Sequence, residues 1–226
     1  MSNDDHARHF ADHGVLRLDG FLGKRHVAPL ARRVLGEVKR LQSGAQSRAL
    51  RGLPVFQQIG RLSGQVAVPH LHETLMTSEL LATIVDLAGR RPSAVQPTQL
   101  LLSPPNQGEW TLRQLSWHVD LVAMPGRLPG IQAFFLVGDV APHGGATLAL
   151  AGSQRAERGD ASSVRRMLKH SADLERDLAA RGLAIVEMSG RAGDVYLMDM
   201  RVLHTPSVNA TRQLRMMATC RCLFSD

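Results

Sequence analysis

Two histidines and one aspartate stand at spacings that suit a metal site. His118 and Asp120 are two positions apart, so on a strand their side chains point to the same face. His204 lies much later in the chain and would reach them from a distant strand. Two imidazoles and one carboxylate leave one face of a metal ion open, which is the ligand arrangement of non-haem Fe(II) oxygenases. An H-x-D pair alone is common by chance, so its sequence context has to support it.

Further motifs follow the H-x-D pair in a fixed order. A glycine-rich turn runs from Gly144 to Gln154, and Gly193-Asp194 opens a strand-like run. Arg215 comes eleven residues after His204, inside an apolar stretch. In this order the pieces resemble the phytanoyl-CoA dioxygenase-like family of Fe(II)/2-oxoglutarate oxygenases. That family shows an H-x-D, a G-x-T-x-x-x-x-G-S-H-like turn, a G-D strand, a distal His and a distal Arg.

The resemblance extends to the beginning of the chain, where residues 10–22 are similar to the family's opening stretch. It therefore covers nearly the whole sequence. The chain departs from the family pattern at Gln154, where His is common, and at Ala151, where Pro is common. Neither position is an expected metal ligand, so both departures concern the turn and its substrate contacts.

The order of the elements and the resemblance together predict the fold. Helices before many short strands indicate an α+β or mainly β domain with a double-layered β structure. Periodicity does not distinguish one β sandwich from another, but the resemblance implies a double-stranded β-helix, a jelly roll of cupin type. We expect one domain, 1–226. Its parts are a helical N-terminal region 1–92 with a lid-like loop 42–69, and a jelly-roll core 93–226 with a helical insertion 158–181.

Apolar periodicity and turn residues give the expected elements. Helices are predicted where apolar residues recur every three or four positions, and strands where short apolar runs stand between turn residues. Segment 42–69 carries glycines and prolines without a sustained period and is expected to be irregular. The predicted helices are 4–11, 24–41 and 73–88, and the predicted strands are 15–18, 95–103, 111–122, 131–140, 147–150, 183–187, 195–198 and 214–224.

The resemblance also implies 2-oxoglutarate as a cosubstrate, whose far carboxylate needs a cation. Arg215 is the candidate, because a guanidinium binds a carboxylate bidentately and this position matches the family's distal Arg. Arg212 is the competing candidate, but it lies nearer the preceding turn. The resemblance implies a hydroxyl contact from Thr147, and Gln99 on an earlier strand could add an amide contact. For both residues, ordinary strand packing stays open as the alternative.

The sequence predicts a dioxygenase that uses Fe(II), 2-oxoglutarate and O2 to hydroxylate a small molecule, with release of succinate and CO2. The substrate is expected to be a secondary metabolite or an amino-acid-like compound, contacted by Gln57, Arg61 and Arg113. Asp120 favours hydroxylation, since a halogenating relative would need a small residue at this position. Two alternatives stay open: a catalytically silent jelly-roll binding module, and an oxygenase or binding protein that acts on nucleic acid.

Composition and charge bear on nucleic-acid binding, membrane association and the cellular compartment. The chain has 226 residues and a net charge of +7, but its arginines are scattered and form no basic run. The scattered distribution argues against binding of nucleic acid. The positive net charge mildly favours an anionic substrate or cosubstrate. No apolar run approaches the length of about 20 residues that spans a bilayer, and the polar N-terminus resembles no secretory signal. We therefore expect a cytoplasmic protein without a membrane partner. Cys220 and Cys222 are expected to be buried thiols in a reducing compartment.

Overall fold

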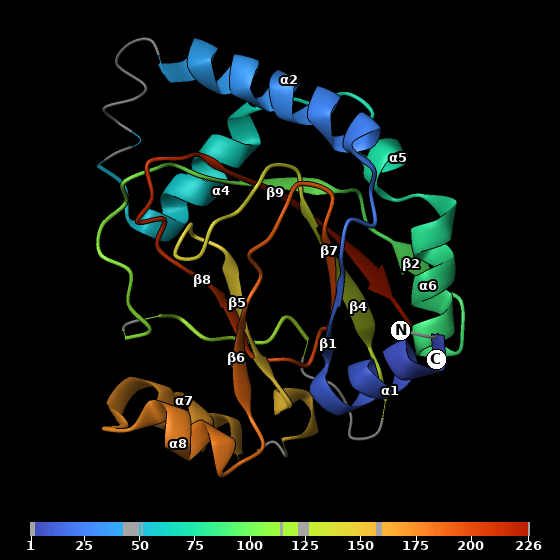
Figure 1. Cartoon of the computed structure of the whole chain (residues 1–226), viewed down its shortest axis with the longest axis vertical. Helices are drawn as coiled ribbons and strands as arrows, with labels where there is room; N and C mark the ends of the chain where they lie inside the picture. Colours follow the sequence, from blue (N-terminus) through green and yellow to red (C-terminus); the bar gives the residue numbers. More distant parts are fainter. Residues whose placement is uncertain are drawn as a thin grey trace.

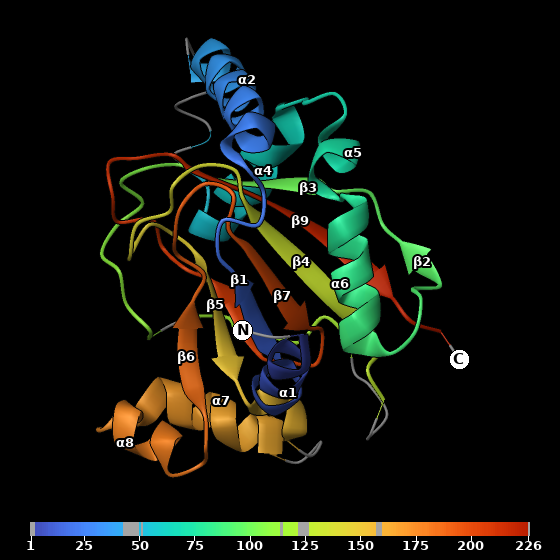
Figure 2. The same cartoon turned by 45° about the vertical axis from the view of Figure 1, so that its right-hand side comes forward.

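Two antiparallel sheets lie against each other, and helices pack on the outer side of each sheet (Figures 1 and 2). The structure is a computed structural model. It describes residues 3–42, 50, 52–113, 115–121, 127–156 and 160–225. Among the described helices, none is both long and apolar enough to cross a membrane.

The larger sheet has the strand order β1–β7–β4–β9–β2, and β3 also pairs with β9. Its side chains alternate between two environments, as a pleated strand requires. On β4, Phe135 packs against the N-terminal helices, while Phe134 and Leu136 face the smaller sheet. On β9, Met217 also faces the smaller sheet, so Arg215 shares this inner face. The strands are β1 (Val15–Leu18), β2 (Ala94–Val95), β3 (Gln99–Ser103), β4 (Gly130–Leu136), β7 (Val195–Asp199) and β9 (Arg215–Leu223).

The smaller sheet has the order β6–β5–β8. Its strands are β5 (Thr147–Ala151), β6 (Ala184–Glu187) and β8 (His204–Pro206). Ala149 of β5 faces the larger sheet, whereas Leu148 and Leu150 pack outward against α7 (Asp160–His170) and α8 (Leu174–Ala179). These two helices lie in the segment 158–181, which was predicted to be mostly helical, and residues 158 and 159 lie outside the described part.

The N-terminal helices cover the outer face of the larger sheet. The predicted helix 24–41 is confirmed as α2. The first helix ends at Gly14, as predicted, because this residue has φ +68° and a Cβ there would lie 2.6 Å from Gln154 Oε1. The helices are α1 (Asn3–His13), α2 (Lys24–Gln42), α4 (Val55–Gln65), α5 (Leu71–Leu75) and α6 (Ser78–Ala88).

The prediction of an irregular lid-like loop over 42–69 is wrong for its central part. Helix α4 occupies this region, and its residues Ile59 and Leu62 are both buried. Packing against strand β3 therefore decides the conformation, although glycines and prolines interrupt the sequence pattern. Residues 43–49 and 51 of the predicted loop lie outside the described part.

Two predicted elements are each divided in the structure. The helix expected over 73–88 is interrupted before Thr77, whose hydroxyl accepts a hydrogen bond from Leu80 N at 3.3 Å and begins α6 as an N-cap. The strand expected over 95–103 is interrupted near Pro97, which has no N–H to donate to a neighbouring strand. In both cases a local hydrogen-bonding constraint outweighs the apolar pattern.

The strand expected over 111–122 is wrong for the residues that the structure describes there. Residues 115–121 meet the sheet at one bridge, between His118 and His204. The partner strand β8 is three residues long, so it offers little edge to pair with. The H-x-D pair therefore belongs to an irregular segment.

Candidate metal centre

The structure brings together the three side chains that the sequence singles out. One ligand atom each of His118, Asp120 and His204 lies within 4.8 Å of the other two. Asp120 Oδ1 is 3.9 Å from His118 Nε2 and 3.8 Å from His204 Nε2. Two metal–ligand bonds of about 2.1 Å span at most about 4.2 Å, so one ion can join Asp120 to each of the two histidines. The donor set and its spacing fit a divalent metal.

Both imidazoles are fixed in the tautomer that a metal needs. His118 Nδ1 lies 2.9 Å from Ser116 O, and His204 Nδ1 lies 3.0 Å from Val202 O. A carbonyl oxygen only accepts hydrogen bonds, so each Nδ1 carries the proton and each Nε2 keeps its lone pair for the site. Burial lowers the pKa of His204, which keeps this imidazole neutral.

Backbone hydrogen bonds and buried side chains fix the position of the irregular segment that contains His118. His118 and His204 exchange two backbone hydrogen bonds, at 3.0 and 2.9 Å. Leu115 and Trp117 are buried among side chains of β5, α7 and α8. Arg165 of α7 adds a hydrogen bond from its Nε to Trp117 O at 3.1 Å. The helical insertion thus supports the metal-site segment.

The glycine-rich turn supports the approach to the second histidine. Ser153 Oγ accepts a hydrogen bond from Leu203 N at 2.9 Å. Gln154 Nε2 donates to Ala11 O at 3.1 Å and to Asp12 O at 3.2 Å, where α1 ends. The glutamine at this position therefore connects the turn to the end of α1.

Sequence reasoning missed one residue of the site. Arg221 of β9 donates from Nε to Asp120 Oδ2 at 3.1 Å, and its Nη2 lies 2.9 Å from the same oxygen. Strand alternation offered a signal, because Arg221 is an even number of positions from Arg215 and therefore shares its face.

Arg215 is buried on the inner face of β9, with 3% of its surface exposed. Its Nε and Nη2 have no hydrogen-bond partner within the described part of the chain, and Nη1 lies 3.5 Å from Met217 Sδ. Burial lowers its pKa to about 10. Arg212 is exposed in the preceding turn, which Asn209 stabilises by accepting from Thr211 N at 3.1 Å. Of the two arginines, Arg215 therefore has the environment that calls for an anionic ligand.

The other two candidates for cosubstrate binding differ in environment. Thr147 is buried on β5, two residues before Ala149, which pairs with His204 and faces the larger sheet. Thr147 therefore points to the same inner face as the site. Gln99 is exposed on β3, opposite Thr219 of β9.

The substrate-binding candidates are all exposed. Gln57 and Arg61 lie on the solvent side of α4, while the neighbouring Gln58 turns inward and donates to Leu53 O at 2.8 Å. Arg113 is exposed at the end of a described stretch. Their substrate contacts stay predictions.

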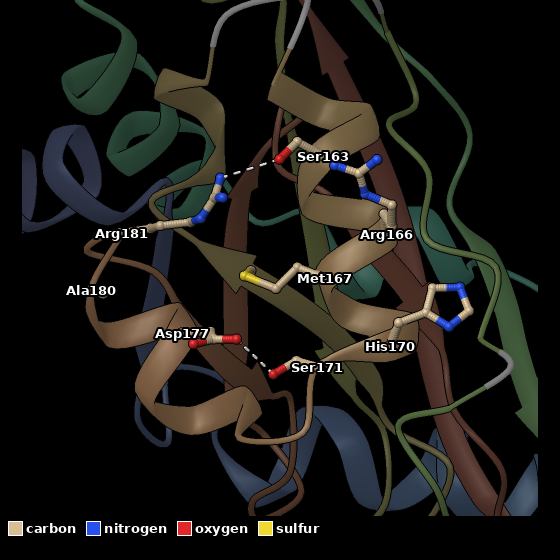
Figure 3. Close-up of a pocket in the computed structure, with 8 residues that line it drawn as sticks. All are labelled: Ser163, Arg166, Met167, His170, Ser171, Asp177, Ala180 and Arg181. Atoms are coloured by element: carbon tan, nitrogen blue, oxygen red, sulfur yellow. Dashed lines mark hydrogen bonds between the residues drawn. The ribbon is translucent and has the colours of Figure 1, made fainter.

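A cavity of about 600 Å³ lies apart from the metal centre, between α7 and α8 (Figure 3). Met167 points into it and also packs with the cluster around Trp117. Hydrogen bonds of 2.8 Å from Ser171 to Asp177, and of 3.5 Å from Arg181 to Ser163, connect its walls. None of its lining residues belongs to the metal-site triad.

A family model described as Phytanoyl-CoA dioxygenase (PhyH) matches residues 10–217. The chain belongs to this family. The match includes the metal-site triad and Arg215, and the family resemblance predicted from the order of motifs is thereby confirmed. Arg221 lies beyond the matched range. A search among curated proteins found no match.

Several solved structures share the fold. The carbocyclase SnoK from nogalamycin biosynthesis, described as non-haem and α-ketoglutarate-dependent, has 18% identity and a TM-score of 0.67, over 100% of this chain and 85% of its own. EctD from S. alaskensis, solved with 2-oxoglutarate and 5-hydroxyectoine, has 19% identity and a TM-score of 0.65, over 99% and 76%. The epimerase SnoN, solved with Fe3+, α-ketoglutarate and nogalamycin RO, has 16% identity and a TM-score of 0.61, over 98% and 83%. The predicted cofactors, Fe(II) and 2-oxoglutarate, agree with these neighbours.

Proposed function

We propose that this protein is a non-haem Fe(II)- and 2-oxoglutarate-dependent oxygenase that hydroxylates a small molecule and releases succinate and CO2. The observation that carries the proposal is the donor set of two Nε2 atoms and one carboxylate oxygen, all within 4.8 Å of one another. Two imidazoles and one carboxylate on one side of an ion are typical of non-haem Fe(II) oxygenases. Membership of the family supports the same chemistry.

The roles of the three side chains follow from their hydrogen bonds. His118, Asp120 and His204 would hold the iron, which when bound supplies the activation of O2 for substrate oxidation. Each imidazole keeps its proton on Nδ1 toward a backbone carbonyl and presents Nε2 to the metal. The triad thus leaves the opposite side of the metal for cosubstrate and O2.

Arg215 is the proposed anchor for the far carboxylate of 2-oxoglutarate. A buried guanidinium without an acidic partner in the described residues is costly, and a carboxylate ligand offsets that cost through charge-assisted hydrogen bonds. Thr147 is proposed to donate its hydroxyl to the same cosubstrate from the inner face of β5. Gln99 is proposed to add an amide contact from β3.

The double-stranded β-helix belongs to the same proposal. The two antiparallel sheets share an apolar interior that includes Phe134, Met217 and Ala149. In a double-stranded β-helix, inward-facing residues of both sheets surround the metal and exclude water from it. This arrangement would place Arg215 and the metal ligands in the same interior between the two sheets.

Proteins of similar fold catalyse different reactions, so the fold does not identify the reaction type. The proposal of hydroxylation is based on Asp120. The neighbours include a carbocyclase and an epimerase, and EctD was solved with a hydroxylated compound, 5-hydroxyectoine. In this chain a carboxylate occupies the position that a halide would need. We therefore propose hydroxylation, with a metabolite-sized substrate.

Anaerobic reconstitution of the purified chain with Fe(II) tests the proposal. After addition of O2 and 2-oxoglutarate, succinate is measured with and without a library of small metabolites. We expect Fe(II)-dependent succinate formation that a substrate stimulates and that His118→Ala lacks. Iron binding without succinate under any condition would contradict the enzymatic function and favour a silent binding module.

A further inference from the structure

The two carboxylate oxygens of Asp120 have different neighbours. Oδ1 lies on the side of the metal donors, 3.9 Å from His118 Nε2 and 3.8 Å from His204 Nε2. Oδ2 accepts a hydrogen bond from Arg221 Nε at 3.1 Å and lies 2.9 Å from Arg221 Nη2. The guanidinium thus occupies one oxygen and leaves the other free for a metal.

Arg221 and Asp120 come from parts of the fold that differ in how many backbone contacts fix them. Arg221 projects from β9, opposite Gln132 of β4, and its carbonyl accepts a hydrogen bond from Gln96 N at 2.9 Å. Asp120 belongs to the segment 115–121, which meets the sheet at a single bridge. The ion pair therefore joins an irregular segment to a strand whose position is fixed on both sides.

We propose that Arg221 is a positioning residue that keeps Asp120 a one-oxygen metal ligand. This inference rests on the proposed function, because it assumes that the triad binds Fe(II). An octahedral ion with two imidazoles and one carboxylate oxygen retains three positions, enough for a chelating keto acid and O2. A carboxylate bound through both oxygens would take one of these positions. By holding Oδ2, Arg221 preserves the open position.

The geometry favours arginine over a simple positive charge. Two nitrogens of the planar guanidinium reach the same oxygen and so hold Oδ2 from two directions, whereas a lysine offers one point charge. The side chain of Arg221 is 38% exposed, so solvent screens the pair and its direct contribution to folding is small. The effect of its loss should therefore appear at the metal site.

Titration of the metal-free chain with Co(II) tests this role without relying on turnover. The proteins compared are wild type, Arg221→Met, Arg221→Lys and a control, Arg17→Met. Arg17 forms a comparable ion pair with Asp194 at 2.8 Å, with 42% of its side chain exposed, and neither partner belongs to the triad. Visible absorption reports cobalt coordination, and a second titration measures the affinity of the cobalt-loaded proteins for 2-oxoglutarate.

We expect Arg221→Met to weaken Co(II) binding by about tenfold or more, as is typical when a ligating carboxylate loses its hydrogen-bond partner. The same variant should bind 2-oxoglutarate more weakly and show an altered cobalt spectrum. Arg221→Lys should fall between Arg221→Met and wild type, and Arg17→Met should match wild type.

Three results would overturn the inference. The first is wild-type affinity and spectrum in both Arg221 variants. The second is an equal loss in Arg17→Met, which would indicate general destabilisation. The third applies if Arg221→Met does not fold: the comparison then uses Arg221→Lys, and unchanged cobalt binding in Arg221→Lys would overturn the inference. Absence of cobalt binding by the wild type would instead contradict the metal centre itself, so the two failures are distinguishable.

Discussion

The two halves of the metal centre are held in different ways. One half is carried by strands: His204 begins β8, and Arg215 and Arg221 share the inner face of β9. The other half, His118 and Asp120, comes from a segment that meets the sheet at one bridge. Strand register fixes the positions of the first half. The second half depends on side-chain packing and on side-chain hydrogen bonds from α7 and β9, which we call tethers.

This difference separates two kinds of substitution. Removing a ligand or an anchor from the strand half removes a contact that nothing nearby replaces. Removing a tether from the irregular half leaves every ligand present but less well positioned. The first kind should have the larger effect on binding, and the second a smaller, graded effect.

The largest effect is expected from the ligands themselves. His204→Ala should abolish Fe(II)-dependent turnover of 2-oxoglutarate while circular dichroism shows a folded protein, and His118→Ala and Asp120→Ala should do the same. Each substitution removes one of the donors that lie within 4.8 Å of one another. Normal succinate formation in any one variant would remove that residue from the ligand set.

The cosubstrate anchor comes next. Arg215→Leu should raise the KM for 2-oxoglutarate at least about tenfold, since losing one partner of a buried charge pair costs roughly 3–5 kcal/mol. Fe(II) affinity should change little, and the ligand-free protein should not lose stability, because the leucine removes a buried cation that has no acidic partner among the described residues. Arg212→Leu is the control, with a much smaller effect from its exposed turn. If the two variants behave the other way round, the anchor is assigned wrongly.

A tether in the irregular half should have an intermediate effect. Arg165→Met removes the hydrogen bond to Trp117 O, and a bond worth about 1 kcal/mol corresponds to about fivefold in metal affinity. The neighbouring Arg166 is exposed, so Arg166→Met is the matched control and should bind metal as the wild type does. Equal Co(II) affinities in the two variants would show that α7 does not support the metal-site segment through this bond.

The smallest effect on the site is expected from the N-terminal helices. Thr77→Ala removes the N-cap of α6 and should lower the free energy of unfolding by about 1 kcal/mol. Metal affinity should stay at the wild-type value, because α6 packs on the outer face of the larger sheet. Denaturant unfolding and Co(II) titration on the same preparation check both parts. A parallel loss of affinity would mean that the outer layer and the site are coupled.

The strand half of the site was the more predictable half. The apolar run 214–224 gave β9 to within one residue at each end, and strand alternation then placed Arg215 inside. For the irregular half, the sequence singled out His118 and Asp120 but predicted the wrong local structure. His118 and Asp120 do come together with His204, although no regular strand carries them among the described residues. Their proximity depends on long-range packing, which the local pattern does not encode.

Two further features were missed for physical reasons. Helix α4 depends on burial of Ile59 and Leu62 and on packing against β3, which together outweigh the glycines in its sequence. Arg221 belongs to no motif, and although strand alternation puts it on the inner face, its contact with Asp120 is a tertiary one that alternation does not predict. Both features become visible once tertiary neighbours are known.

A crystal structure of the chain with Mn(II) and 2-oxoglutarate, grown without O2, tests the central claim most directly. The account predicts one anomalous peak bound by His118 Nε2, His204 Nε2 and Asp120 Oδ1, with the far carboxylate of 2-oxoglutarate on Arg215. A peak elsewhere, or a structure in which the cosubstrate leaves Arg215 without an anionic partner, would contradict it.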